Sequence, residues 1–166
     1  MFGFDSPLAI AVLGAAIAAI LGGIGSAIGV GLVGQGGAGV LTEKPEEFGK
    51  ILLLEALPGT QGIYGFLGAL LILIQIGLIG GAPKAIDTAT AWQFFYAALP
   101  VAFTGLVSGI HQGKVAAAGL NIVAKDPANT GKAVIMSAMV ETYAVLGLLV
   151  SVLLIFGIQI PAAATV

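Results

Sequence analysis

The chain has 166 residues, of which 58% are hydrophobic and only 8% are charged, with a net charge of −2. A soluble domain carries about a quarter of its residues as charges, so this composition excludes an ordinary soluble domain and favours the bilayer as solvent. The lack of cysteine excludes a disulfide framework and thiolate metal sites, and the lack of arginine argues against nucleic-acid binding.

Four apolar segments are long enough to cross a bilayer as helices, which takes about 20 residues each. The positions of the charged residues predict spans at roughly 8–42, 50–80, 91–124 and 132–159. No basic residues precede the first span, so we expect it to be a retained helix rather than a cleaved signal peptide. The sequence therefore predicts an all-α membrane protein.

The first span is crowded with glycine, and the third repeats this feature more weakly around Gly105, Gly109 and Gly113. Residues 29–34 match a dinucleotide-binding fingerprint, but that motif requires a preceding strand, whereas here it lies within a long uncharged helix. Small residues three and four apart instead let helices approach closely in lipid. These two spans are interpreted as the inner wall of a ring of identical subunits, with packing inside one monomer as the alternative.

The second span contains a break at residues 57–64, Leu-Pro-Gly-Thr-Gln-Gly-Ile-Tyr. Pro58 lacks an amide donor and crowds the preceding turn, which leaves a carbonyl near Leu54 free. Broken helices at membrane depth expose carbonyls where these line a site. Thr60 and Tyr64 are four residues apart and share one face of the helix.

Short polar connections separate the spans, with proline at Pro45 and Pro127 in the first and third connections. The middle loop contains residues 80–83 with Lys84 and Asp87. Lysines other than Lys84 flank the first and third connections, so the positive-inside rule places turns 43–49 and 125–131 in the cytoplasm and both termini outside. Those five lysines are Lys44, Lys50, Lys114, Lys125 and Lys132.

An internal repeat with an offset of 82 residues aligns residues 22–75 with 104–157 without a gap. Identical pairs include Ser26/Ser108, Gly31/Gly113, Pro45/Pro127 and Thr60/Thr142. The repeat predicts a duplicated helical hairpin, with the first copy at 1–83 and the second at 84–166. In this register Gly59 aligns with Glu141, so each chain carries a single carboxylate at this depth.

Glu141 is the only charged residue within 133–166, and it lies about 14 Å from the cytoplasmic end of the last span, near the bilayer midplane. A carboxylate there costs at least about 2.5 kcal/mol, which favours a functional role over a permanently protonated structural one. The repeat register puts Thr60 and Gln61 at the depth of Thr142 and Tyr143, beside Glu141, and Gln112 stands at comparable depth in the third span. One carboxylate with neutral oxygens favours a monovalent hard cation, because Ca²⁺ prefers more negative charge and transition metals prefer nitrogen or sulfur.

Two other polar residues have simpler interpretations. His111 precedes Gln112 and points to a different face, so it is interpreted as a packing or lumen-facing residue rather than a ligand. Glu55 lies nearer the cytoplasmic end of the second span, where snorkelling or ion pairing with Lys50 or Lys114 is favoured over a role in ion access.

Three segments carry a resemblance to a known family: residues 57–65, 108–119 and 139–144. They resemble the proteolipid subunit of V-type ATPases, called K or c, in its bacterial sodium-translocating form. The resemblance covers nearly the whole chain. Glu55 and His111 stand where uncharged residues are expected in that family, and the middle loop and the tail 159–166 match nothing in it.

The resemblance implies a homo-oligomeric rotor ring in the plasma membrane, turned by ATP hydrolysis in a separate soluble head. It implies a stator membrane subunit that supplies an arginine, which this chain lacks, and a central stalk docked at the turns near Pro45 and Pro127. It also implies a Na⁺ site in which Tyr64 holds the carboxylate by a hydrogen bond. Its ligands would be Glu141, Gln112, Gln61, Thr60 and the main-chain carbonyl of Leu57.

Other functions remain open at this stage. A proton needs only a carboxylate and a hydrogen-bond partner, so the extra oxygens of Thr60, Gln61 and Gln112 favour Na⁺ over H⁺. A small self-contained proton-coupled transporter and a tetraspan scaffold without transport are alternatives. The sequence shows no phosphate loop, nucleophile triad or metal cluster, so we expect no catalysis by the chain itself.

Overall fold

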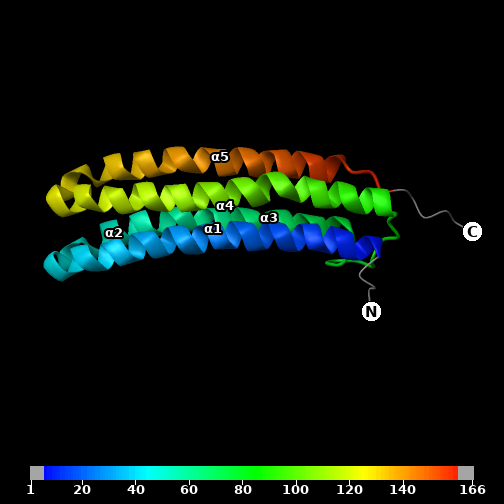
Figure 1. Cartoon of the computed structure of the whole chain (residues 1–166), viewed down its shortest axis with the longest axis horizontal. Helices are drawn as coiled ribbons and strands as arrows, with labels where there is room; N and C mark the ends of the chain where they lie inside the picture. The colour runs from blue at the N-terminus through cyan, green and yellow to red at the C-terminus, as the bar shows by residue number, and fades with distance from the viewer. Residues whose placement is uncertain (1–5, 161–166) are drawn as a thin grey trace, which may run out of the picture.

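In the computed structural model, which describes residues 6–160, four long helical rods run side by side (Figure 1). The first is α1 (Pro7–Glu43) and the third is α4 (Thr88–Lys125). The second rod consists of the 3₁₀ turn η1 (Pro45–Glu47), α2 (Phe48–Ala56), the 3₁₀ turn η2 (Leu57–Gly59) and α3 (Thr60–Gln75). The fourth consists of η3 (Pro127–Asn129) and α5 (Thr130–Gly157). All four rods are long and apolar enough to cross a membrane, which confirms the prediction of four spans.

The second span differs from its prediction at both the break and the end. At Pro58 the helix tightens into the single turn η2 and then continues, so the break is local. The helix ends at Gln75 rather than near residue 80, because Gly77 takes a left-handed backbone with φ of +78°. The chain then turns back, and the Lys84 amide donates to the Ile76 carbonyl at 3.0 Å.

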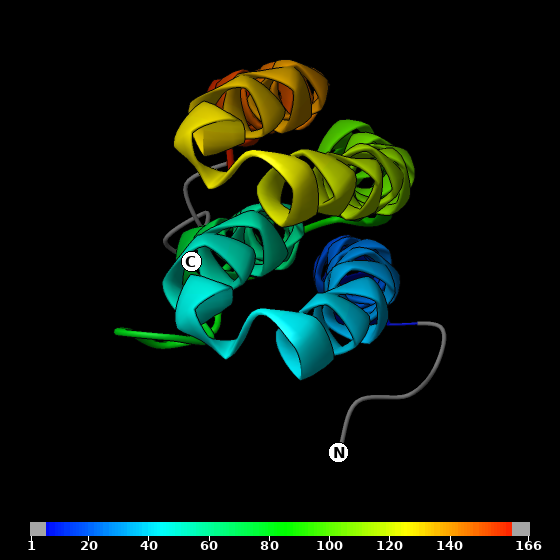
Figure 2. The ribbon, with the colours of Figure 1, turned by 90° about the vertical axis from the view of Figure 1, so that its left-hand side faces the viewer.

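Two hairpins are stacked on each other (Figure 2). The lower hairpin contains α1 with α2 and α3, and the upper one contains α4 with α5. The parallel helices α1 and α4 form the closest contact between them: a Cβ added at Gly25 would lie 2.6 Å from the Gly105 carbonyl oxygen. Glycine at these positions therefore lets the two backbones approach, as expected for helices packed in lipid.

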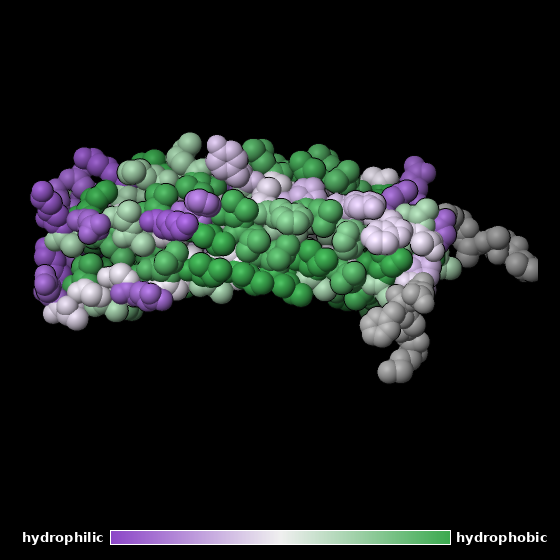
Figure 3. All heavy atoms as spheres, in the orientation of Figure 1, coloured by the Kyte–Doolittle hydropathy of each residue, from purple (hydrophilic) through white to green (hydrophobic). Residues whose placement is uncertain are grey.

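The outer surface is mostly apolar, and a hydrophobic band lies between more hydrophilic ends (Figure 3). Large side chains such as Ile63, Tyr143 and Leu153 are 65%, 66% and 73% exposed. Exposure on this scale suits lipid or a neighbouring subunit rather than water. The ends that we expect outside the cytoplasm, residues 1–5 and 161–166, lie outside the described residues.

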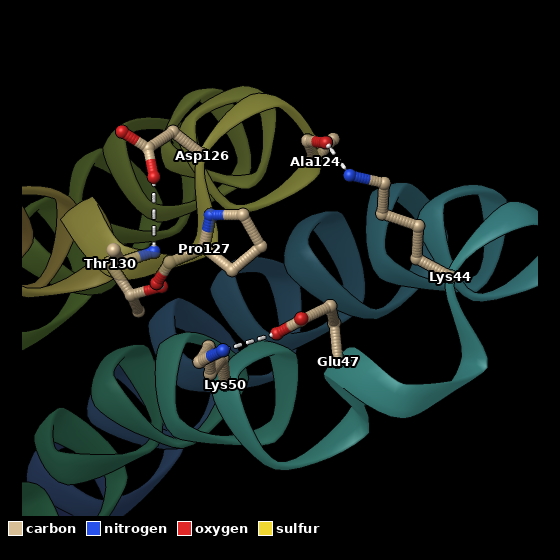
Figure 4. Close-up of polar contacts among 8 residues, drawn as sticks. Lys44, Glu47, Lys50, Ala124, Asp126, Pro127 and Thr130 are labelled. Atoms are coloured by element: carbon tan, nitrogen blue, oxygen red, sulfur yellow. Dashed lines mark hydrogen bonds and ion pairs between the residues drawn. The ribbon is translucent and has the colours of Figure 1, made fainter.

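Polar contacts hold the two proline-containing turns together at one end of the bundle (Figure 4). Lys44 Nζ donates to the Ala124 carbonyl at 2.5 Å, which joins the end of α1 to the end of α4. Lys50 Nζ pairs with Glu47 Oε2 at 2.6 Å. Of the alternatives left open for Glu55, pairing with Lys50 is thus not the one that the structure shows, because Glu47 is one turn away and takes the lysine.

Two apolar clusters occupy the two halves of the bundle. One, nearer the middle loop, includes Ala18, Ile72 and Phe94. The other, nearer the paired turns, includes Leu54 and Leu120. Between the two clusters each rod contributes at least one polar side chain, and we call this set the polar layer. It contains Ser26, Thr60, Gln61, Tyr64, Ser108, Gln112 and Glu141.

Candidate functional site

The polar layer is built around Glu141 on α5. Both of its carboxylate oxygens accept hydrogen bonds from other helices. The Tyr64 hydroxyl on α3 donates to Oε1 at 2.5 Å, and Gln112 Nε2 on α4 donates to Oε2 at 3.3 Å. Because hydrogen bonds to a charged acceptor are roughly twice as strong as neutral ones, these donors fix the carboxylate between three helices.

A pair of buried glutamines extends this network away from Glu141. Gln61 and Gln112 both have no exposed surface. Gln61 Nε2 donates to Gln112 Oε1, and it also lies 3.2 Å from Ser108 Oγ. Within residues 6–160, Gln61 Oε1 has no hydrogen-bond partner although it is buried. A buried acceptor without a donor costs about 1–3 kcal/mol, so this oxygen is available to a positively charged ligand.

Two of the residues expected as ligands are bonded to each other instead. Thr60 Oγ1 donates to the Leu57 carbonyl oxygen at 3.1 Å, across the turn η2. In the described structure neither residue makes a hydrogen bond to Glu141. The structure thus joins Tyr64 and the two glutamines to the carboxylate, and it keeps Thr60 and Leu57 as a separate pair.

Two serines of the polar layer were not predicted as site residues. Ser108 Oγ donates to the Val140 carbonyl at 2.9 Å, next to Glu141 in the chain. Ser26 Oγ on α1 accepts from the Gly62 amide at 2.7 Å, next to Gln61. The repeat carried the signal that could have found them, because Ser26 and Ser108 are one of its identical pairs.

Glu55 and His111 both lie outside this network. His111 is exposed and lines an apolar groove with Phe103, Val107 and Tyr143, whereas Gln112 is buried, so the two neighbours lie on different faces of α4 as expected. The Glu55 carboxylate is half-buried and lies against Gly34 of α1, where an added Cβ would meet Glu55 Oε1 at 2.7 Å.

The chemistry of this layer is that of one carboxylate surrounded by neutral oxygen and amide groups. Residues 6–160 contain no group of three or more histidine, cysteine or acidic side chains placed to hold a metal ion. This part of the chain therefore lacks the cluster of charged or nitrogen and sulfur ligands that a divalent or transition metal prefers. Glu141 is the single ionisable centre to which the network of Gln61, Gln112 and Tyr64 is directed.

The sequence profile of the ATP synthase C subunit matches the chain twice, at residues 13–72 and 95–154. The chain belongs to this family. The second match begins and ends 82 residues after the first, which is the offset of the internal repeat.

Among its relatives is the V-type sodium ATPase subunit K of Enterococcus hirae, which is 51% identical over 89% of this chain and 90% of the relative. The A-type ATP synthase subunit K of Methanocaldococcus jannaschii is 43% identical over 92% of this chain and 64% of that protein. The 16 kDa proteolipid of the V-type proton ATPase of Nephrops norvegicus is 30% identical over 86% of this chain and 87% of the relative. These findings confirm the resemblance to the V-type proteolipid and make the chain a membrane subunit of a V/A-type rotary ATPase.

Proposed function

We propose that this chain is the ion-carrying subunit of a V-type ATPase rotor ring and binds one Na⁺ at Glu141. The observation that carries the proposal is the buried network around this carboxylate, in which Gln61 Oε1 has no partner within the described residues. The name of the Enterococcus hirae relative, a sodium ATPase subunit, supports the choice of ion.

The ligands of the ion are oxygens of Glu141, Gln112, Gln61 and Thr60, with the carbonyl oxygen of Leu57. Gln61 Oε1 has no hydrogen bond to break within the described residues, whereas Thr60 releases its hydrogen bond to Leu57 so that both oxygens turn to the ion. A single negative charge matches a single positive charge, which leaves the loaded site neutral. Tyr64 donates to Glu141 and holds the carboxylate in the closed arrangement.

Neutrality is the property that makes transport possible. A bare carboxylate facing lipid is costly, and a neutralised one is much cheaper. Each subunit therefore loads one ion at Glu141, carries it through lipid as the ring turns, and releases it where a stator arginine takes over the carboxylate. The duplicated hairpins at 1–83 and 84–166 share this one site, because Gly59 occupies the position of Glu141 in the first copy.

The remaining elements of the assembly follow from this role. ATP is hydrolysed in a separate soluble head, and the chain itself performs no catalysis. The central stalk docks on the cytoplasmic turns 43–49 and 125–131, near Pro45 and Pro127, which the bond from Lys44 to Ala124 ties into one surface. The ring lies in the plasma membrane with both termini outside.

Labelling with a hydrophobic carbodiimide tests the site and the ion together. The expected result is that Glu141 reacts, that millimolar Na⁺ slows the reaction near neutral pH, and that Glu141→Gln abolishes it. Glu55→Gln is the matched control, since it removes another half-buried carboxylate and leaves Glu141 intact. Labelling of Glu141 that is insensitive to Na⁺ and slowed only by rising pH would assign the site to H⁺ instead.

The mass of the assembly in detergent tests the ring. A ring of many copies is expected, with ATP hydrolysis in the whole complex lost in the Glu141→Gln variant when the two sectors are coupled. A monomer or dimer that transports a substrate without an ATPase would establish the self-contained transporter. If Glu141→Gln left the function unchanged, the remaining hypothesis would be a four-span scaffold protein without a transport role.

A further inference from the structure

The contact between α1 and α4 follows the sequence repeat. Gly25 of α1 meets Gly105 of α4, and Gly29 meets Gly109 and Gly113. The partners are thus 80 and 84 residues apart, on either side of the repeat offset of 82. The upper hairpin therefore packs on the lower one as successive copies of one unit, and a further copy stacked by the same relation would place α1 of the next chain on α4.

On α1, the face that this stacking would use is smooth and open. Subtracting 82 from the α4 positions that meet α1 gives Gly23, Ala27 and Gly31. Gly23 and Ala27 are exposed, and a Cβ added at Gly23 or Gly31 would meet nothing within 4 Å. Packing inside the described chain therefore does not explain these glycines. Gly34 continues the same stripe, since it lies one turn after Gly31.

On α4, the opposing face is also exposed. Adding 82 to Gly25 and Gly29 gives Val107, which is 55% exposed, and His111. Lys114 and Ala118 follow at helical spacing on the same face and are both exposed. In Figure 2 α1 belongs to the lower hairpin and α4 lies above it in the upper hairpin, so further copies can be added to the stack in the same direction.

A charged residue lies at each face, and the two are at the same depth: Glu55 of α2 beside the α1 face and Lys114 on the α4 face. Glu55 places its carboxylate on Gly34, at the edge of the α1 face. It lies ten residues beyond Pro45, or about 15 Å into the span, and Lys114 lies eleven residues before Lys125, or about 16 Å. Rotation about an axis along the membrane normal preserves depth, so the two groups meet at one level in neighbouring copies. Within residues 6–160 neither side chain has a hydrogen-bond or ion-pair partner.

We propose that Glu55 of one subunit forms an ion pair with Lys114 of the next subunit, across an interface in which the exposed α4 face packs on the Gly23–Gly34 stripe. This inference rests on the proposed ring and adds the interface and the charged pair that set its register. Charged groups within a membrane span are stabilised by pairing with each other. The missing side chain at Gly34 leaves room for the Glu55 carboxylate to lie against α1, at the edge of the face on which the next subunit packs.

Cross-linking tests the pair directly, because the chain has no native cysteine. The full-length variant Glu55→Cys with Lys114→Cys is treated with a short bismaleimide in purified rings. A ladder of covalent oligomers in denaturing gels is the expected result. The control combines Glu55→Cys with Tyr96→Cys, since Tyr96 lies on the same α4 face but 18 residues, or about 27 Å, away from Lys114. The control should give no ladder.

Charge exchange tests the energetic contribution. Glu55→Gln and Lys114→Gln should each lower the temperature at which the ring dissociates in detergent. The single reversal Glu55→Lys should lower it further, and adding Lys114→Glu to that variant should restore it. Lys132→Gln, an exposed lysine near the turns, is the control and should leave the temperature unchanged.

The outcomes separate this proposal from the ring itself. A particle with the mass of a monomer would overturn both. A ring whose Glu55→Cys, Lys114→Cys variant gives only an internal cross-link or none, or whose charge-exchanged variant is no more stable than the single reversal, would overturn the ion pair and leave the ring standing. Such a result would favour snorkelling of each side chain toward the cytoplasmic surface over pairing.

Discussion

The hydroxyl of Tyr64 lies 2.5 Å from Oε1 of Glu141, so a hydrogen bond joins α3 to α5 across a sequence separation of 77 residues. In the repeat register Tyr64 aligns with Leu146, five residues or about 7.5 Å beyond Glu141 along the span. The tyrosine side chain therefore reaches back along the bundle to the carboxylate, and the bond links the second span to the fourth.

Replacing Tyr64 by phenylalanine removes the hydrogen bond to Glu141 but keeps the aromatic ring of the side chain. A hydrogen bond to a charged group contributes about 1.5–3 kcal/mol, so the Na⁺ concentration that half-protects Glu141 from carbodiimide should rise by roughly 10-fold or more. Tyr143→Phe is the control, because Tyr143 is 66% exposed and makes no bond to Glu141. An equal effect in both variants would contradict a specific role for Tyr64.

Replacing Gln61 by methionine tests the unpartnered oxygen. The variant keeps a side chain of similar length but loses Oε1, and it also leaves Gln112 Oε1 without its donor. We expect loss of Na⁺ protection at Glu141 together with a decrease in stability of about 1–3 kcal/mol. Thermal unfolding in detergent and carbodiimide labelling measure the two effects separately. Gln75→Met, at the half-buried end of α3, should change neither.

The sequence predicted the four spans because a bilayer requires long uncharged segments, and the charged residues alone set most of their ends. It did not predict the end of the second span, since residues 76–79 are as apolar as those before them. The left-handed backbone at Gly77 ends the helix there, and a single sequence does not reveal such a conformation. The sequence also left the partner of Lys50 open, because two acidic residues, Glu47 and Glu55, lie near it in the chain, and the structure pairs it with Glu47.

The sequence also brought together most of the candidate site. Glu141 stood out by its isolation. The repeat placed Gln61 at its depth, and the position of Gln112 in the third span placed it there too; in the structure Gln61 bonds to Gln112, which bonds to Glu141. The sequence could not predict which way the side-chain amides of Gln61 and Gln112 point, because that depends on which neighbouring groups donate hydrogen bonds to them. For the same reason the bond between Thr60 and Leu57, and the role of Ser108 in holding Gln61, appear only in three dimensions.

The start of α4 should respond to acid at Asp87, outside the spans. Hydrogen bonds from Thr90, including its backbone N–H at 2.7 Å, hold the pKa of the Asp87 carboxyl below its usual value of 3.8. A lowered folded-state pKa means that this carboxylate stabilises the fold above pH 3.8 and that the contribution disappears as the pH falls through the folded value. Asp87→Asn keeps the cap acceptor and should remove that part of the acid dependence, measured as the unfolding temperature against pH. The unchanged acid dependence of Asp87→Asn would contradict the assignment.

The close contact between α1 and α4 requires glycine at position 25. A Cβ at Gly25 would lie 2.6 Å from the Gly105 carbonyl oxygen and 2.8 Å from Leu106 Cα, and backbone atoms cannot move aside as a flexible side chain could. Gly25→Ala should therefore force the two hairpins apart, at a cost of about 1–3 kcal/mol by overpacking. Gly39→Ala on the same helix meets nothing within 4 Å and should be neutral or stabilising by up to about 1 kcal/mol, because alanine favours the helix. Thermal unfolding of both variants in detergent measures the difference, and equal stability would show that the hairpins are free to separate without loss.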